Sequence, residues 1–154
     1  MLELIHNRIL LFALAGNLVA QVLKLLIHWI SEREFNLKRM VEAGGMPSSH
    51  SATVSALATG VWIEYGPGSP HFAIAAIFAF IVLWDAAGVR SAAGKHAEIL
   101  NVLKRDLQHL LSKNFENVNL KTLLGHTKFQ VFSGVVTGIL TTLMFYWLSG
   151  FWKE

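Results

Sequence analysis

Residues 44–55, GGMPSSHSATVS, are a polar interruption in a chain otherwise rich in Leu, Ala, Val and Phe. The glycine pair at 44–45 lets the backbone turn tightly. Pro47 suits the start of a helix, and Ser48 or Ser49 can cap it. Such a helix start binds anions, phosphate above all, through free N–H groups and the positive end of its dipole. His50 would lie in its first turn. The simpler interpretation is a plain cap whose histidine faces lipid headgroups.

A second group of polar residues lies inside the first apolar run. Asn17, Gln21, Lys24 and His28 are spaced four, three and four residues apart, so they share one stripe of a helix. A charge inside a membrane span costs about 2.5–3.5 kcal/mol, so it usually faces a partner or a wet cavity. Lys24 alone could be explained by snorkelling to the interface. Snorkelling does not explain Asn17 and Gln21.

Two further stretches carry polar residues at the ends of apolar runs. WDAAGVR contains Asp85 and Arg90, for which a simple ion pair is one interpretation. LGHTKFQVFSGVVTG places His126, Gln130 and two glycines at four-residue steps, on one helical face. The glycines indicate close packing, and close packing would also fix the position of the histidine.

Two histidines with Lys and Arg, and no cluster of carboxylates, suit phosphoryl transfer better than metal binding. One imidazole can attack phosphorus while the other protonates the leaving oxygen, and the cations stabilise the charge of the transition state. The chemistry therefore predicts a phosphate site without metal or other cofactor.

The composition indicates a membrane protein that positions these residues on helices. The chain has 154 residues, 53% hydrophobic and 15% charged, with mean hydropathy +0.46 and no cysteine. Soluble domains usually carry about 25% charged residues. We expect an all-α bundle of about four spanning helices, in one membrane-embedded domain covering residues 1–154. The expected spans are residues 9–30, 48–65, 71–89 and 129–152.

The distribution of Lys and Arg predicts the orientation. Ten lie in the two connections that would share one side: Arg33, Lys38, Arg39, Arg90, Lys95, Lys104, Arg105, Lys113, Lys121 and Lys128. Only Arg8 and Lys153 lie on the other side. The positive-inside rule then makes the protein a multi-pass component of a bacterial-type plasma membrane, with extracytoplasmic termini and the site on the cytoplasmic side.

The insertion at residues 91–125 is expected to be cytoplasmic. Within it, residues 97–111 carry apolar side chains at helical spacing: Ile99, Leu103, Leu107 and Leu110. This pattern predicts an interfacial helix on the membrane surface, between the third and fourth spans.

The polar residues together resemble the type-2 phosphatidic acid phosphatases, which are related to vanadium haloperoxidases, and are most similar to a short, divergent bacterial branch. That family has three motifs: Lys-x6-Arg-Pro, Pro-Ser-Gly-His and Ser-Arg-x5-His-x3-Asp. PSSH at 47–50 matches the second with serine for glycine. The resemblance implies that His50 is the general acid and that Ser48, Ser49 and Arg90 bind phosphate.

Two residues compete for the nucleophile that the resemblance implies. His96 follows Arg90 at the family's spacing, but Leu100 then occupies the aspartate position. Alternatively the insertion splits the third motif, and His126 is the nucleophile, followed by Gln130 where the family has an acid. We favour His126.

The chain departs from the family at two of these motifs. Gln130 replaces the carboxylate that would orient the nucleophile, and an amide at the equivalent place of a serine-protease triad costs about 10⁴ in rate. Asp85 is the candidate substitute. Lys-x6-Arg-Pro is absent, and Lys24, Lys38 and Arg39 are the candidate replacements.

The resemblance implies a metal-independent hydrolase of the acid-phosphatase type. Its substrate would be a lipid phosphate or a polyprenyl diphosphate in the membrane, not a nucleic acid, cleaved through a phosphohistidine intermediate. The alternative is a catalytically inactive relative that acts as a membrane scaffold or as a carrier of anions or lipids.

Overall fold

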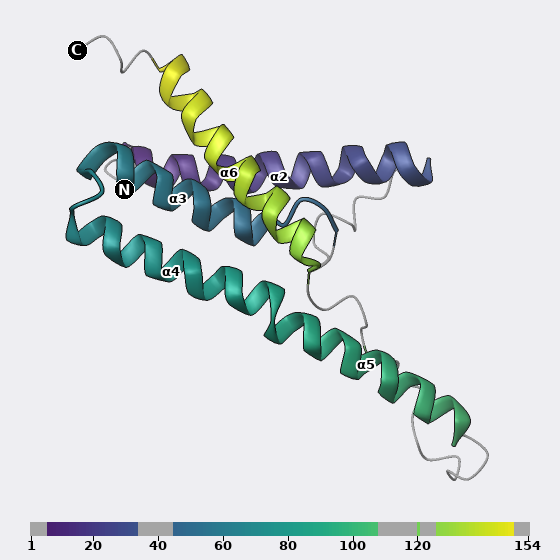
Figure 1. Ribbon diagram of the computed structural model, residues 1–154. Helices are drawn as coiled ribbons and strands as arrows, with labels where there is room; N and C mark the ends of the chain where they lie inside the picture. Colours follow the sequence, from purple (N-terminus) through teal and green to yellow (C-terminus); the bar gives the residue numbers. More distant parts are fainter. Residues whose placement is uncertain (1–5, 34–44, 108–119, 121–125, 150–154) are drawn as a thin grey trace.

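The computed structural model describes residues 6–33, 45–107, 120 and 126–149 (Figure 1). All regular secondary structure in these residues is helical. Its helices are α2 (Arg8–Glu32), α3 (Ser49–Tyr65), α4 (Pro70–Ala87), α5 (Val89–Asp106) and α6 (Lys128–Leu148). The expected all-α class is therefore confirmed, and the four expected apolar segments coincide with α2, α3, α4 and α6.

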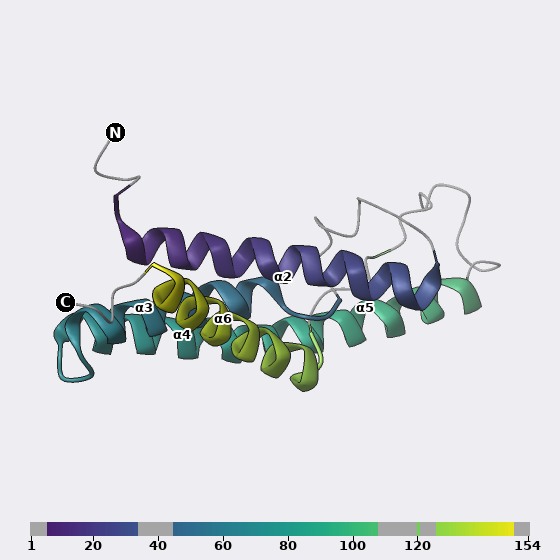
Figure 2. The same ribbon diagram turned by 90° about the horizontal axis from the view of Figure 1, so that it is seen from above.

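Helix α3 lies at the centre of the bundle and packs against α2, α4 and α6, while α2 also packs against α6 (Figures 1 and 2). Small residues allow this packing, because they let helix backbones approach closely. A Cβ on Gly16 of α2 would come 2.8 Å from the Cβ of Ala56, and a Cβ on Gly138 of α6 would collide with the carbonyl oxygen of Ala52. The buried core is accordingly rich in Ala, Ser, Thr and Gly.

Large apolar side chains point away from the bundle instead of into it. On α4, Ile74, Ile77, Phe80 and Ile81 are all more than half exposed, which suits a surface covered by lipid. Among the described residues, three helices are long and apolar enough to cross a membrane: Arg8–Glu32, the continuous stretch Pro70–Arg105, and Lys128–Leu148. Helix α3 has 17 residues and is not among them. That α3 also crosses remains a prediction.

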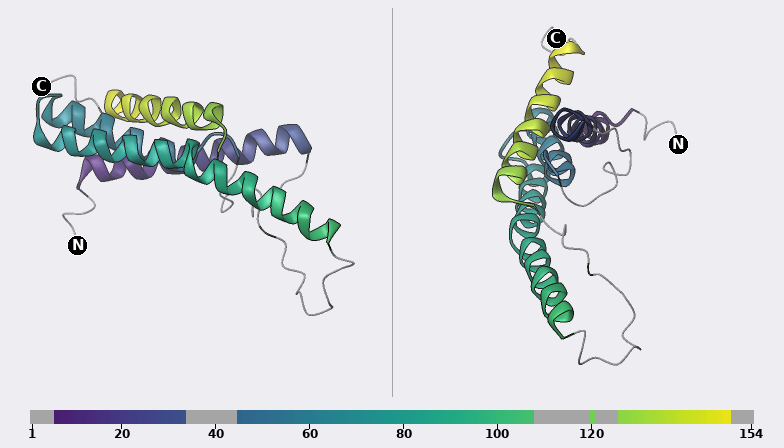
Figure 3. Two further views of the ribbon diagram at one scale, coloured as in Figure 1. Left: turned by 60° about the horizontal axis from the view of Figure 1, so that its bottom comes forward. Right: turned by 90° about the vertical axis from the view of Figure 1, so that its right-hand side faces the viewer.

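Helix α5 corrects the expected position of the helix in the insertion. That helix was expected at residues 97–111, but it begins at Val89 and ends at Asp106. Only Gly88 separates α4 from α5, and the backbone bonds from Gly88 N–H to Trp84 and from Ala92 N–H to Gly88 bridge the break. Helix α5, which carries the apolar stripe expected in the insertion, therefore continues α4 away from the bundle (Figure 3). Leu110 of that stripe lies outside the described residues.

Candidate functional site

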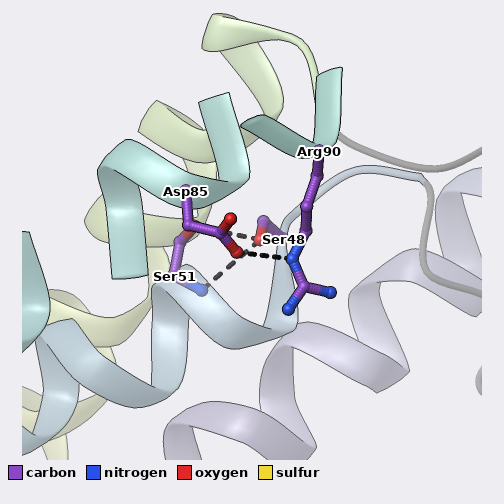
Figure 4. Close-up of polar contacts among 4 residues, drawn as sticks. All are labelled: Ser48, Ser51, Asp85 and Arg90. Carbon is purple, nitrogen blue, oxygen red and sulfur yellow. Dashed lines mark hydrogen bonds and ion pairs between the residues drawn. The ribbon is translucent and has the colours of Figure 1, made fainter. Parts of the chain in front are cut away.

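The start of α3 is built by a tight turn. Gly45 has φ +97°, a conformation that favours glycine, and a Cβ there would also come 3.2 Å from the Cγ and Cδ of Lys24. Ser48 is the N-cap, and its side chain accepts a hydrogen bond from the Ser51 N–H (3.4 Å). The Ser51 hydroxyl also donates to the Ser48 hydroxyl oxygen (2.9 Å; Figure 4). Ser48, Ser49 and Ser51 are all buried.

The start of α6 lies directly against the start of α3. Thr127 and Gln130 form a capping box: Gln130 N–H donates to the Thr127 hydroxyl (3.2 Å), and Thr127 N–H donates to the Gln130 side-chain oxygen (3.0 Å). The Gln130 carbonyl oxygen then accepts from the backbone N–H of Ser48 (3.1 Å). The side-chain oxygen of Gln130 is thus used to begin its own helix.

His126 lies just before this cap and is held to α4, because its backbone N–H donates to the carbonyl oxygen of Ala86 (3.3 Å). The side chain is only 5% exposed, and neither ring nitrogen has a hydrogen-bond partner. Buried polar atoms are nearly always paired, so two unpaired nitrogens on one ring indicate a place where a ligand or water binds.

The surroundings keep His126 neutral. Burial is the largest cause that lowers the pKa of His126 to about 4, and positive charge on Lys24, His50 and Arg90 contributes to the same shift. Lys24, His50 and Arg90 come from α2, α3 and α5, so three helices contribute basic side chains whose charge acts on this imidazole. A neutral imidazole with basic side chains near it is suited to bind an anion.

Lys24 is 5% exposed, although it lies on a helix whose outer face would meet lipid. Its aliphatic stem runs past Gly45, in the turn that leads into α3. Two other residues of its stripe have partners within the protein. Asn17 donates to the Thr53 hydroxyl of α3 (2.9 Å), and His28 pairs with Glu32 (3.3 Å). The side-chain oxygen of Gln21 is buried without a partner.

Asp85 and Arg90 form the ion pair that was the simpler interpretation, with 2.6 Å between the carboxylate oxygen and Nε (Figure 4). The pair bridges the break between α4 and α5. Neither Asp85 nor Gln130 hydrogen-bonds the ring of His126. Within the part of the chain that the structure describes, the nucleophile proposed from the sequence therefore has no orienting carboxylate, and its position is fixed by burial and by its backbone bond to Ala86.

The remaining predicted site residues are distributed as follows. His50 is exposed in the first turn of α3, and Ser49 is buried beside it. His96, the alternative nucleophile, is exposed on α5, in the part that leaves the bundle. Lys38 and Arg39 lie outside the described residues. The sequence analysis missed Ser51, whose signal was its place three residues after a capping serine.

Comparisons with known proteins identify the family of the chain. A model of the "Divergent PAP2 family" (DUF212) matches residues 5–141. The "Uncharacterized membrane protein YuiD" of Bacillus subtilis (strain 168) is 44% identical over 152 residues, covering 93% of this chain and 96% of the relative. No solved structure matches the chain.

Proposed function

This chain belongs to the Divergent PAP2 family and is a multi-pass membrane protein, and from that premise we propose that it is a phosphatase of lipid phosphates or polyprenyl diphosphates. The observation that carries the proposal is His126: a buried imidazole with both nitrogens unpaired, next to Lys24, His50 and Arg90. A phosphate group would place its negative oxygens among the cations and its phosphorus within reach of a neutral nitrogen.

The proposed reaction has two steps and needs no metal or other cofactor. In the first, a ring nitrogen of His126 attacks phosphorus, the bond from phosphorus to the leaving oxygen breaks, and His50 gives that oxygen a proton. In the second, water attacks the phosphorus of the phosphohistidine and gives a proton back to His50, the phosphorus–nitrogen bond breaks to free His126, and inorganic phosphate leaves. Lys24, Arg90 and the start of α3 offset the charge that develops on the phosphoryl oxygens. Lys38 and Arg39 stay candidates for the same role.

A second candidate function is favoured by the capping box. Because Gln130 begins α6 and Asp85 is held by Arg90, no carboxylate among the described residues hydrogen-bonds the His126 ring. A relative without that support could bind a phosphate headgroup and not turn it over, acting as a membrane scaffold or carrier.

One experiment separates the two functions. Detergent-purified protein would be given a panel of phosphatidic acid, lysolipid phosphates and polyprenyl diphosphates, and the release of phosphate measured beside a His126→Ala control. A phosphatase releases phosphate from at least one substrate, and the control releases none. Binding of phosphate or vanadate without release would support the binding protein instead.

A further inference from the structure

Ser48 has a buried hydroxyl whose accepting capacity is already used. A hydroxyl offers one donor and two acceptor sites. The Ser48 oxygen accepts from the N–H of Ser51 (3.4 Å) and from the Ser51 hydroxyl (2.9 Å), and both side chains are 0% exposed. What remains on Ser48 is its single proton, for which the described residues offer no acceptor.

The groups around Ser48 determine which acceptor its hydroxyl proton can bind. Ser48 begins α3, beside His50 and bonded through its backbone to the first turn of α6, a few residues after the unpaired ring of His126. Positive charge acts on the His126 ring from Lys24 of α2, His50 of α3 and Arg90 of α5. These basic groups favour an anionic ligand, and the oxygens of a phosphoryl group would also accept the Ser48 proton.

We propose that Ser51 is a positioning residue, whose hydroxyl turns the Ser48 hydroxyl so that its one proton points into the anion site. This inference rests on the proposed function for the identity of the ligand, but its physical content is anion binding alone. Without the Ser51 hydroxyl, Ser48 can rotate and donate back to the protein. The site then loses one prearranged donor to the phosphoryl oxygens.

The test is a double-mutant cycle in the full-length, detergent-purified protein, with orthovanadate and inorganic phosphate as probes. Ser51→Ala should weaken vanadate binding about 3- to 10-fold, the usual range for one hydrogen bond. Ser48→Ala should weaken it about 10- to 100-fold, because a hydrogen bond to a charged ligand is lost. Adding Ser51→Ala to Ser48→Ala should change nothing more, since Ser51 acts only through Ser48.

The matched control is Ser55→Ala, which removes a buried serine hydroxyl one turn further along α3. It should leave vanadate binding unchanged. Thermal melting of every variant separates a general loss of packing from a loss of binding. Equal effects of Ser51→Ala and Ser55→Ala, or losses that add in the double variant, would overturn the assignment.

Turnover measured in parallel separates this inference from the proposed function. If the wild type binds vanadate, releases no phosphate from any lipid and shows the cycle above, Ser51 positions Ser48 in a site that is not catalytic. If the wild type is an active phosphatase and the cycle is additive, the function holds and the role of Ser51 fails. A wild type that binds neither anion overturns both.

Discussion

The backbone N–H of Ser48 donates to the carbonyl oxygen of Gln130 across 3.1 Å, and so fastens the first turn of α3 to the first turn of α6. This bond joins two sequence motifs that are far apart in the chain. It also leaves the two helix starts side by side, with His50 on one and His126 just before the other. The candidate site exists because these two starts meet.

Gly134 should be essential for the contact between the first turns of α3 and α6. A Cβ at this position would collide with the carbonyl oxygen of Ser48 and would lie 2.8 Å from the Cβ of Ser51. We expect Gly134→Ala to force α6 away from α3, to cost about 1–3 kcal/mol of stability as overpacked cores do, and to weaken vanadate binding. Gly68→Ala is the control, because a Cβ there meets nothing within 4 Å. Equal melting temperatures for the two variants would contradict the packing argument.

Asp85→Asn separates the two roles considered for this carboxylate. The pair with Arg90 is partly exposed, and such pairs contribute at most about 1 kcal/mol. Asparagine keeps an acceptor for Arg90, so we expect a small change in melting temperature, turnover within a few-fold of wild type, and somewhat tighter vanadate binding as a negative charge is removed. Abolished turnover in a folded variant would show instead that Asp85 supports His126 during the reaction.

Gln130→Glu introduces the acid that the resemblance to the type-2 phosphatidic acid phosphatases implies at this place. Glutamate also satisfies a capping box and suits the positive end of a helix, so the fold should be unchanged. If lack of a carboxylate limits His126, phosphate release should be preserved or raised. A loss of turnover in this variant, with melting unchanged, would mean that the amide itself is needed.

The protonation of His126 can be followed by histidine NMR, with His126→Gln used to assign its signals. The pKa of this imidazole is lowered from 6.5 to about 4, so it is neutral above that pH and gains its proton only as the pH falls through about 4. The nucleophile should therefore be available throughout pH 5–8. Lys24→Met removes one of the charges that lower this pKa, so the midpoint should move upward. Added phosphate should also raise it. A midpoint near 6.5 in the wild type would show that the ring is hydrated and not enclosed.

The positions of the four apolar helices could be predicted from the sequence, because membrane-spanning segments are recognisable by their length and apolar composition. The sequence was also sufficient to pair PSSH with His126, since helix starts on one side of a bundle must lie near each other. Three features could not be predicted from the sequence. Whether Gln130 faces His126 or its own helix start is a choice between competing hydrogen bonds, and the local capping box prevails. The junction at Gly88 was missed because α5 follows α4 with only this one residue between them. Burial of Lys24 depends on Gly45, far along the chain.

Orientation in the membrane can be tested with single cysteines, because the chain has none of its own. Lys95→Cys lies on exposed α5, and Gly68→Cys lies in the turn between α3 and α4, at the opposite end of α4. If the excess of Lys and Arg marks the cytoplasmic side, an impermeant thiol reagent should label position 68 in intact cells and position 95 only after permeabilisation. The reverse pattern would place the candidate site on the outer face.

The two histidines should differ in how they depend on the leaving group. An alcohol is a poor leaving group and needs a proton, whereas a nitrophenolate departs readily on its own. General acid catalysis contributes about 10²–10⁴-fold. His50→Ala should therefore lose that much turnover on a lipid phosphate and much less on an aryl phosphate. His126→Ala should abolish turnover of both substrates, because no nucleophile remains to form the phosphohistidine.

His96→Ala completes this comparison, since His96 is the alternative nucleophile and lies exposed on α5. With His126 as the nucleophile, wild-type protein quenched during turnover should carry acid-labile phosphate that is kept in His96→Ala and absent from His126→Ala. Parallel losses on both substrates in His50→Ala and His126→Ala would show that the division of roles is wrong. Labile phosphate lost only in His96→Ala would move the chemistry from the bundle to α5.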